Sequence, residues 1–167
     1  MLGFYENFPP YAHRVERFAI AVSNRKFQQM LVQTLYKING KVFKFEEVAK
    51  PPISNCSVIF EFGVADGDGF NYLDLEELNR VMEVVRKKPL QIMDFFCAVR
   101  YYSEKNGKKT HLKFDYYMIR LIFSESRVEF YTFHERGLGH LLPEDIINLI
   151  VARVNEVSSR KVLKRIE

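Results

Sequence analysis

The sequence lacks most of the features that identify a class of protein at first sight. It has no tryptophan and only two cysteines in 167 residues. It contains neither a GxxxxGK[ST] nor a GxGxxG motif, the signatures of nucleotide-binding loops. No apolar run approaches the roughly 18 residues that a membrane-spanning helix needs, and no signal sequence opens the chain. We therefore expect a soluble protein of the cytoplasm, with no membrane partner and no bound cofactor.

The scarce residue types also indicate an environment. Cys56 and Cys97 both lie inside apolar segments that are typical of strands. Buried free thiols explain these positions better than a disulfide or a metal pair, which favours a reducing, intracellular setting. Only four glutamines are present, a scarcity found in thermophilic proteins.

The sequence does contain an ordinary globular composition that is rich in two aromatic residue types. Hydrophobic residues make up 47% and charged residues 28%, which suits one domain with a sizeable core. The 15 phenylalanines suit that core, whereas the nine tyrosines suit the edge of water or a partner. The net charge of +4 and the pI of about 9.0 are compatible with an anionic partner.

Hydrophobic periodicity divides the chain into strands and helices. Strands are predicted at 17–22, 41–48, 56–64, 90–102, 110–123 and 127–134. Helices are predicted at 24–38, at 75–88 and from Pro143 onward; a single helix over 13–38 is the competing interpretation of the first segment. Residues 1–14 suggest an irregular arm, 15–158 a single α+β domain, and 159–167 a basic C-terminal tail.

The predicted order is β-α-β-β-α-β followed by β-β-α, which describes an α+β protein with a mostly antiparallel sheet and two or three helices. Residues 17–102 match the element order of a ferredoxin-like split βαβ sandwich. Taken from residue 75, the chain shows instead the α-β-β-β-α order of a double-stranded-RNA-binding domain. The second alternative is weakened because the last helix begins with Pro143-Glu144-Asp145, where such domains are basic.

The hairpin that joins residues 90–102 to residues 110–123 carries the strongest functional signal. Asn106-Gly107 is a preferred pair for a two-residue type I′ turn. That turn would place Tyr102 opposite His111 and Arg100 opposite Lys113. Two like charges directly opposite each other destabilise a sheet unless an anion lies between them. We therefore expect an anion near the second of these pairs.

Two sources of that anion are open. Asp115 lies diagonal to Arg100 in this register and could supply the charge from within. Alternatively, an external phosphate bridges the two cations. Tyr117 and the other rings of the same face would then stack on bases, since binding of single-stranded nucleic acid needs both stacking partners and positive charge. The turn adds three further cations at one end of the face, Lys105, Lys108 and Lys109.

A second candidate anion site lies at the start of the first long helix. Ser23 would cap this helix, and Arg25 and Lys26 would follow in its first turn, where free backbone N–H groups favour phosphate. Two solvent-facing basic residues are the alternative interpretation. The full predicted set for nucleic acid or phosphate is Arg25, Lys26, Arg100, Tyr102, Lys105, Lys108, Lys109, His111, Lys113 and Tyr117.

The segment FHERGLGHLLPED holds His134, Glu135 and His140 in a glycine-containing loop. Imidazoles and carboxylates at the start of a helix could perform acid–base chemistry. Their spacing fits no standard zinc pattern, so a third ligand would have to come from elsewhere: His13, His111 or Asp115. We therefore predict neither a metal site nor a catalytic residue.

The segment DGDGFNYLDLEEL resembles a calcium-binding loop at first sight. Counted from Asp66, position five is Phe70 and the turn glycine at position six is Asn71, so the pattern fails. Asp74 and Glu77 instead form a capping box for the helix at 75–88. The residues before it, 65–71, are expected to form a flexible acidic turn.

We rank three functions on these observations. A non-enzymatic module for single-stranded DNA or RNA, using the basic and aromatic face of the sheet, comes first. A protein-interaction or self-associating domain comes second because tyrosine and phenylalanine are common at interfaces. A small-molecule enzyme or ligand-binding protein, with a pocket near His111, His134 and Glu135, comes third.

Overall fold

The computed structural model describes residues 1–50, 54–105 and 107–166, with Leu112 described by its backbone only. Asn106 of the expected turn therefore lies outside the described residues. Lys105 and Lys108, on either side of Asn106-Gly107, pair with each other. The elements are β1 (Arg14–Ile20), α1 (Asn24–Ile38), β2 (Val42–Lys44), a 3-10 turn (Phe45–Glu47), β3 (Cys56–Asp66), β4 (Gly69–Tyr72), α2 (Leu75–Lys87), β5 (Ile92–Lys105), β6 (Lys108–Ser124), β7 (Arg127–Arg136), α3 (Pro143–Glu156) and β8 (Leu163–Ile166).

The strands form one eight-stranded sheet in the order β2-β3-β5-β6-β7-β1-β8, and β4 pairs with β3. All of these pairs are antiparallel, so the expected α+β class with a mostly antiparallel sheet is confirmed. The ferredoxin-like arrangement of residues 17–102 is not confirmed. The reason is that β1 pairs with β7 and β8, and two strands separate it from β5.

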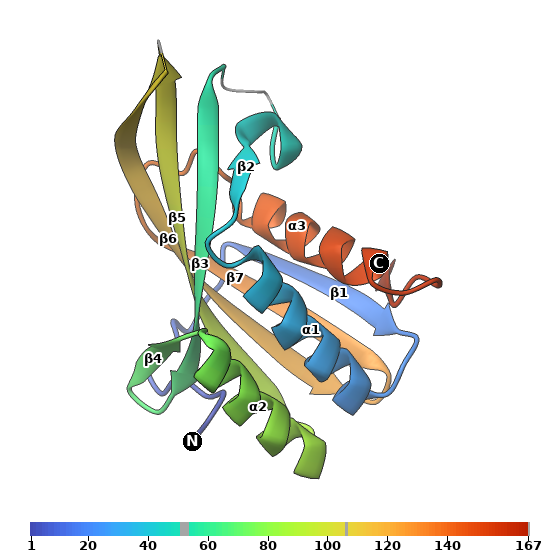
Figure 1. Ribbon diagram of the computed structural model, residues 1–167. Helices are drawn as coiled ribbons and strands as arrows, with labels where there is room; N and C mark the ends of the chain where they lie inside the picture. Colours follow the sequence, from blue (N-terminus) through green and yellow to red (C-terminus); the bar gives the residue numbers. More distant parts are fainter. Residues whose placement is uncertain (51–53, 106, 167) are drawn as a thin grey trace.

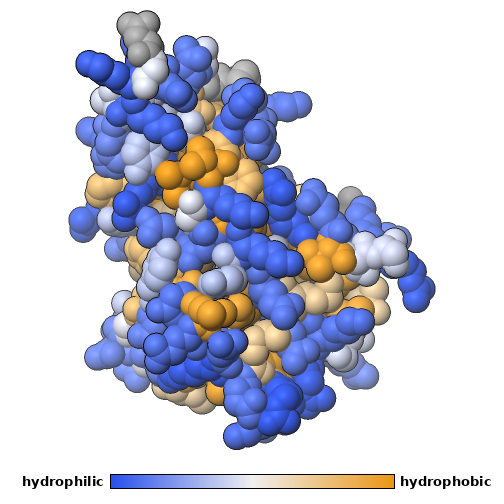
Figure 2. All heavy atoms as spheres, viewed as in Figure 1, coloured by the Kyte–Doolittle hydropathy of each residue, from blue (hydrophilic) through white to orange (hydrophobic). Residues whose placement is uncertain are grey.

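The three helices lie on the same face of the sheet, and the β5–β6 hairpin extends beyond them at the top of Figure 1. Their apolar faces pack on alternate residues of the strands, among them Phe95, Val99 and Phe130, which are almost fully buried. Figure 2 shows the same side of the molecule as a mostly hydrophilic surface with small, separate apolar patches. Among the described residues, no helix is long and apolar enough to cross a membrane. The opposite face of the sheet, called the outer face below, carries no helix in the described part of the chain.

Two strands were not expected from the sequence. β4 folds back on β3 with Asp66 opposite Gly69, so 65–71 is a hairpin rather than a flexible turn. Asp66 binds Arg80 at 2.6 Å and the N-terminal amine at 3.4 Å, and the hydrogen bond from Arg80 lowers the pKa of its carboxyl. β8 occupies part of the expected basic tail because Val162 and Leu163 are buried there.

The predicted start of α2 gives a direct test of local structure. The Asp74 carboxylate accepts a hydrogen bond from the Glu77 backbone at 2.8 Å, which satisfies one of the free N–H groups of the first turn. We expect Asp74→Ala to lower the free energy of unfolding by about 1 kcal/mol, measured by urea denaturation. The control is Asn79→Ala on the exposed side of the same helix. Equal losses in the two variants would contradict a capping role for Asp74.

The N-terminal arm, residues 1–13, crosses the outer face rather than extending into solvent. Gly3 donates to Ala65 and accepts from Asp94 at 2.7 and 2.6 Å, and Tyr5 donates its backbone N–H to the Asp94 carboxylate at 2.8 Å. Further along, Phe8 packs near β6 and β7. The arm therefore covers one half of the outer face, at the end where β3 pairs with β4, and leaves the half near the β5–β6 turn open.

Candidate nucleic-acid interface

A β-bulge in β6 decides which side chains share the outer face. Tyr102 lies opposite His111 as predicted, but the register then shifts by one residue, and Arg100 lies opposite Phe114. The predicted pair of Arg100 with Lys113 is therefore wrong. Arg100 instead forms an ion pair with Glu61 of β3 at 2.9 Å.

The bulge exchanges the faces of every residue of β6 that follows it, since side chains alternate along a strand. Asp115 pairs with Val99 and Tyr117 pairs with Cys97, and both lie on the helix-covered face with no exposed area. The prediction that Tyr117 belongs to the open face is thus corrected. Phe114 and Tyr116 take the outer positions in its place.

The outer face carries a continuous row of aromatic rings, called the aromatic row below. Successive ring centroids lie 4.6–6.3 Å apart, close enough for direct contact. The row consists of Tyr102, His111, Phe114, Tyr116, Phe96, Phe70 and Tyr5. The arm supplies Tyr5 and covers that end of the row, whereas the Phe114 residue near the other end is 38% exposed. The open part, from Tyr102 to Tyr116, could therefore stack planar groups from solution.

Cations surround this open part, and one of them lies opposite an acidic residue. Arg136 lies opposite Tyr116 on β7, and Lys113 is exposed beside Phe114. Lys109 lies opposite Glu104, which offsets its charge. The strongest anion signal is at the turn, where Lys105 lies directly opposite Lys108. This like-charge pair differs from the predicted pair of Arg100 with Lys113, which does not form.

The structure does not bring Arg25 and Lys26 to this face. α1 begins at Asn24, and Ser23 accepts a hydrogen bond from the Lys26 backbone at 3.1 Å, so the predicted cap is present. Arg25 donates to the Val85 carbonyl at the end of α2, which engages its side chain. In Figure 1 the start of α1 and the β5–β6 turn lie at opposite ends of the molecule.

A buried carboxylate on the helix-covered face was missed as a structural element. Asp115 accepts hydrogen bonds from the Tyr101 hydroxyl at 2.6 Å and from His134 Nε2 at 2.9 Å. It also accepts from the backbone N–H groups of Gly139 and His140 at 2.7 and 3.2 Å. Asp115 therefore ties the loop before α3 to the centre of the sheet.

The cluster of residues around Asp115 also includes Tyr117 and Gly137. Tyr117 donates its hydroxyl to the Leu141 carbonyl, and burial raises the pKa of both Tyr101 and Tyr117. A Cβ at Gly137 would overlap Asp115 Oδ1, and its φ of +117° is a conformation that L side chains rarely adopt. The loop can thus approach the strand only with glycine at this position.

The arrangement of Asp115 with His134 resembles the base and orienting group of a catalytic triad. In the described part of the chain, however, no serine, threonine or cysteine side chain hydrogen-bonds to His134. His111 lies on the outer face, because the bulge separates it from His134. No group of three potential ligands close enough to hold a metal ion occurs among the described residues. The cluster therefore has the contacts of a structural anchor.

Comparisons with known proteins do not assign a role to either site. No family model matches the chain, and no curated protein or solved structure matches it either. The case for function consequently depends on the geometry of the outer face.

Proposed function

We propose that the protein binds single-stranded nucleic acid on the open part of its outer face. The observation that supports this most is the row of rings from Tyr102 to Tyr116 on a sheet face without a helix. Stacking on aromatic side chains is tolerant of base identity, because every base has a flat face. The Lys105 and Lys108 pair at the end of the row supplies charge for the phosphates.

The stacking part of the proposal predicts the effect of Phe114→Ala on oligonucleotide binding. Each stacked base contributes about 1–3 kcal/mol, so the variant should bind a fluorescent single-stranded 12-mer about tenfold more weakly in a polarisation titration at low salt. Val157→Ala is the matched control, because it removes another exposed apolar side chain, at the end of α3. No polarisation change in the unmodified protein, or equal losses in the two variants, would contradict the proposal.

Salt dependence separates the contribution of the lysines from that of the rings. Replacing both Lys105 and Lys108 by alanine should reduce the slope of log K against log salt by about one or two. Phe114→Ala should leave that slope unchanged. A slope that is already flat in the unmodified protein would contradict a role for phosphate contacts.

The same aromatic row also favours a second candidate function, self-association. Aromatic side chains are enriched at protein–protein interfaces, and Phe114 is one of the exposed large apolar residues. Light scattering distinguishes the two functions. Self-association predicts a mass that rises with concentration and returns to that of a monomer in Phe114→Ala, whereas nucleic acid binding alone predicts a monomer in both.

A further inference from the structure

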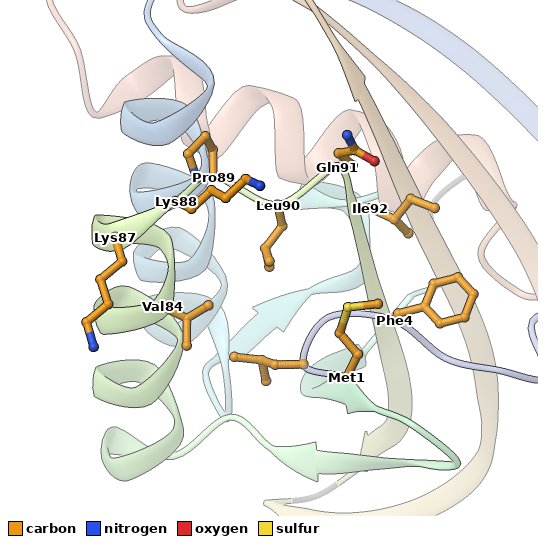
Figure 3. Close-up of a pocket in the computed structure, with 10 residues that line it drawn as sticks. Met1, Phe4, Val84, Lys87, Lys88, Pro89, Leu90, Gln91 and Ile92 are labelled. Atoms are coloured by element: carbon orange, nitrogen blue, oxygen red, sulfur yellow. The ribbon is translucent and has the colours of Figure 1, made fainter.

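An apolar groove lies between α2 and the N-terminal arm, away from the open part of the aromatic row. Its volume is about 740 Å³, and Met1, Leu2 and Phe4 of the arm line one wall. The remaining lining comes from α2 and the segment that follows it: Val84, Lys87, Lys88, Pro89, Leu90, Gln91 and Ile92. Figure 3 shows Val84, Leu90 and Met1 projecting toward the same space. The volume lies within the range of about 300–1,000 Å³ that holds small organic ligands.

The floor of this groove is held in place by buried polar contacts. The side-chain amide of Gln28, which has no exposed area, donates to the Leu90 carbonyl at 2.7 Å and accepts from the Leu90 N–H at 2.9 Å. Gly3 packs so closely on Leu90 that an added Cβ would lie 2.9 Å from its Cδ1. The arm and the floor therefore fit together as a preformed wall and base rather than as a loose surface gap.

The charge at the rim is positive. Arg86 is neutralised by Glu83 at 2.7 Å, and Lys87 lies 3.8 Å from the same carboxylate. Lys88 forms no ion pair among the described residues, and it lines the groove next to Pro89 and Leu90. The negative end of α2 is already offset, since Arg25 donates to the Val85 carbonyl. An apolar interior with a free cation at the rim is complementary to an anionic amphiphile.

We propose that this groove binds a linear acyl chain with an anionic head group, the chain lying against Val84 and Leu90 and the head group at Lys88. Apolar lining favours a chain over a planar polar ligand, because it offers few groups for hydrogen bonds. The head group is a carboxylate or a phosphate monoester, and both would be recognised through charge alone. This site is independent of the nucleic acid proposal.

Calorimetric titration of the whole protein with octanoate, decanoate, dodecanoate and dodecyl phosphate tests the site. Affinity should increase by about fourfold for each methylene group, because each buried methylene contributes about 0.8 kcal/mol. Dodecyltrimethylammonium, with a similar chain and the opposite charge, should bind more weakly than either anion. Equal affinity for the two anions would support recognition through charge alone, whereas a preference for one would identify the head group.

Two variants connect the binding to the groove. Lys88→Glu should weaken dodecanoate binding about fivefold, whereas Lys161→Glu, an exposed lysine elsewhere in the described chain, should not. Val84→Phe should shorten the longest chain that binds, because the larger side chain fills part of the groove. Absence of heat, indifference to chain length, or equally tight binding of the cation would overturn the proposal. Oligonucleotide polarisation should be unchanged by dodecanoate, so failure here does not affect the proposed function.

Discussion

Asp115→Ala should lower the free energy of unfolding by about 3–5 kcal/mol, one of the two largest effects that we expect in this protein. The carboxylate is completely buried and accepts four hydrogen bonds. Alanine would leave all four donors without a partner, and burying an unpaired donor costs more than the hydrogen bond itself contributes. Urea denaturation of the variant beside the unmodified protein measures the loss.

The loop contacts give this prediction a second, local measurement. Hydrogen exchange at the backbone amides of Gly139 and His140 should accelerate in Asp115→Ala far more than exchange in the core of α1, since both amides donate to the missing carboxylate. Asp115→Asn keeps the shape and one acceptor, so it should lose about half as much stability. Glu135→Ala, on the exposed surface of the same segment, is the control and should change stability by less than about 0.5 kcal/mol. Similar losses at residues 115 and 135 would show that the carboxylate is not the anchor described above.

Asp94→Ala should release the N-terminal arm and cost about 3 kcal/mol, because it leaves a largely buried guanidinium unpaired. Asp94 has no exposed area and accepts two hydrogen bonds from Arg120, both at 2.8 Å. The same guanidinium lies over the rings of Phe4 and Phe8, 5.0 and 4.4 Å from their centroids. The carboxylate, the guanidinium and the two rings thus form the main attachment of the arm.

Limited chymotrypsin digestion measures the release directly. Tyr5 and Tyr11 should become cleavable in Asp94→Ala while the core remains resistant, because both lie in the arm. Arg120→Lys is the matched comparison: it keeps the charge but loses the paired hydrogen bonds and the flat contact with the rings, so its effect should be intermediate. An arm that stays protected in Asp94→Ala would refute this attachment.

Local signals in the sequence were sufficient for most of the secondary structure. α1 has the predicted bounds, 24–38, because Ser23 caps it and Asn39-Gly40 follows its last turn. α2 begins at the predicted residue for the same kind of reason. These features depend on neighbours within a few residues, which a sequence displays directly. β4 and β8 were missed because their partners, β3 and β1, give them order that their own short segments do not specify.

The binding face could be predicted only in part, and the bulge is the reason. Asn106-Gly107 predicted the register next to the turn, and Tyr102 and His111 were therefore paired correctly. No glycine marks the bulge in residues 110–117. One extra residue in β6 places Phe114 and Tyr116 on the outer face and Asp115 in the core. The order of polar and aromatic residues in 112–117 does not show the shift in register, because both kinds of residue occur on each face of this part of β6. Tertiary contacts with the loop before α3 decide which face the carboxylate takes.

The position of β1 has a consequence for how the chain folds. β1 lies between β7 and β8, with Arg14 opposite Thr132 and Phe18 opposite both Val128 and Arg165. β5, β6 and β7 are joined by short turns, so each strand can pair with the preceding one as soon as it has been synthesised. β1, in contrast, pairs with strands that lie more than a hundred residues later in the chain. A chain still emerging from the ribosome therefore carries RVERFAI as an unpaired strand until β7 has been made. We expect the pairing of β1 with β7 to be the slow step of folding. The basic strand β8 then pairs with the other edge of β1.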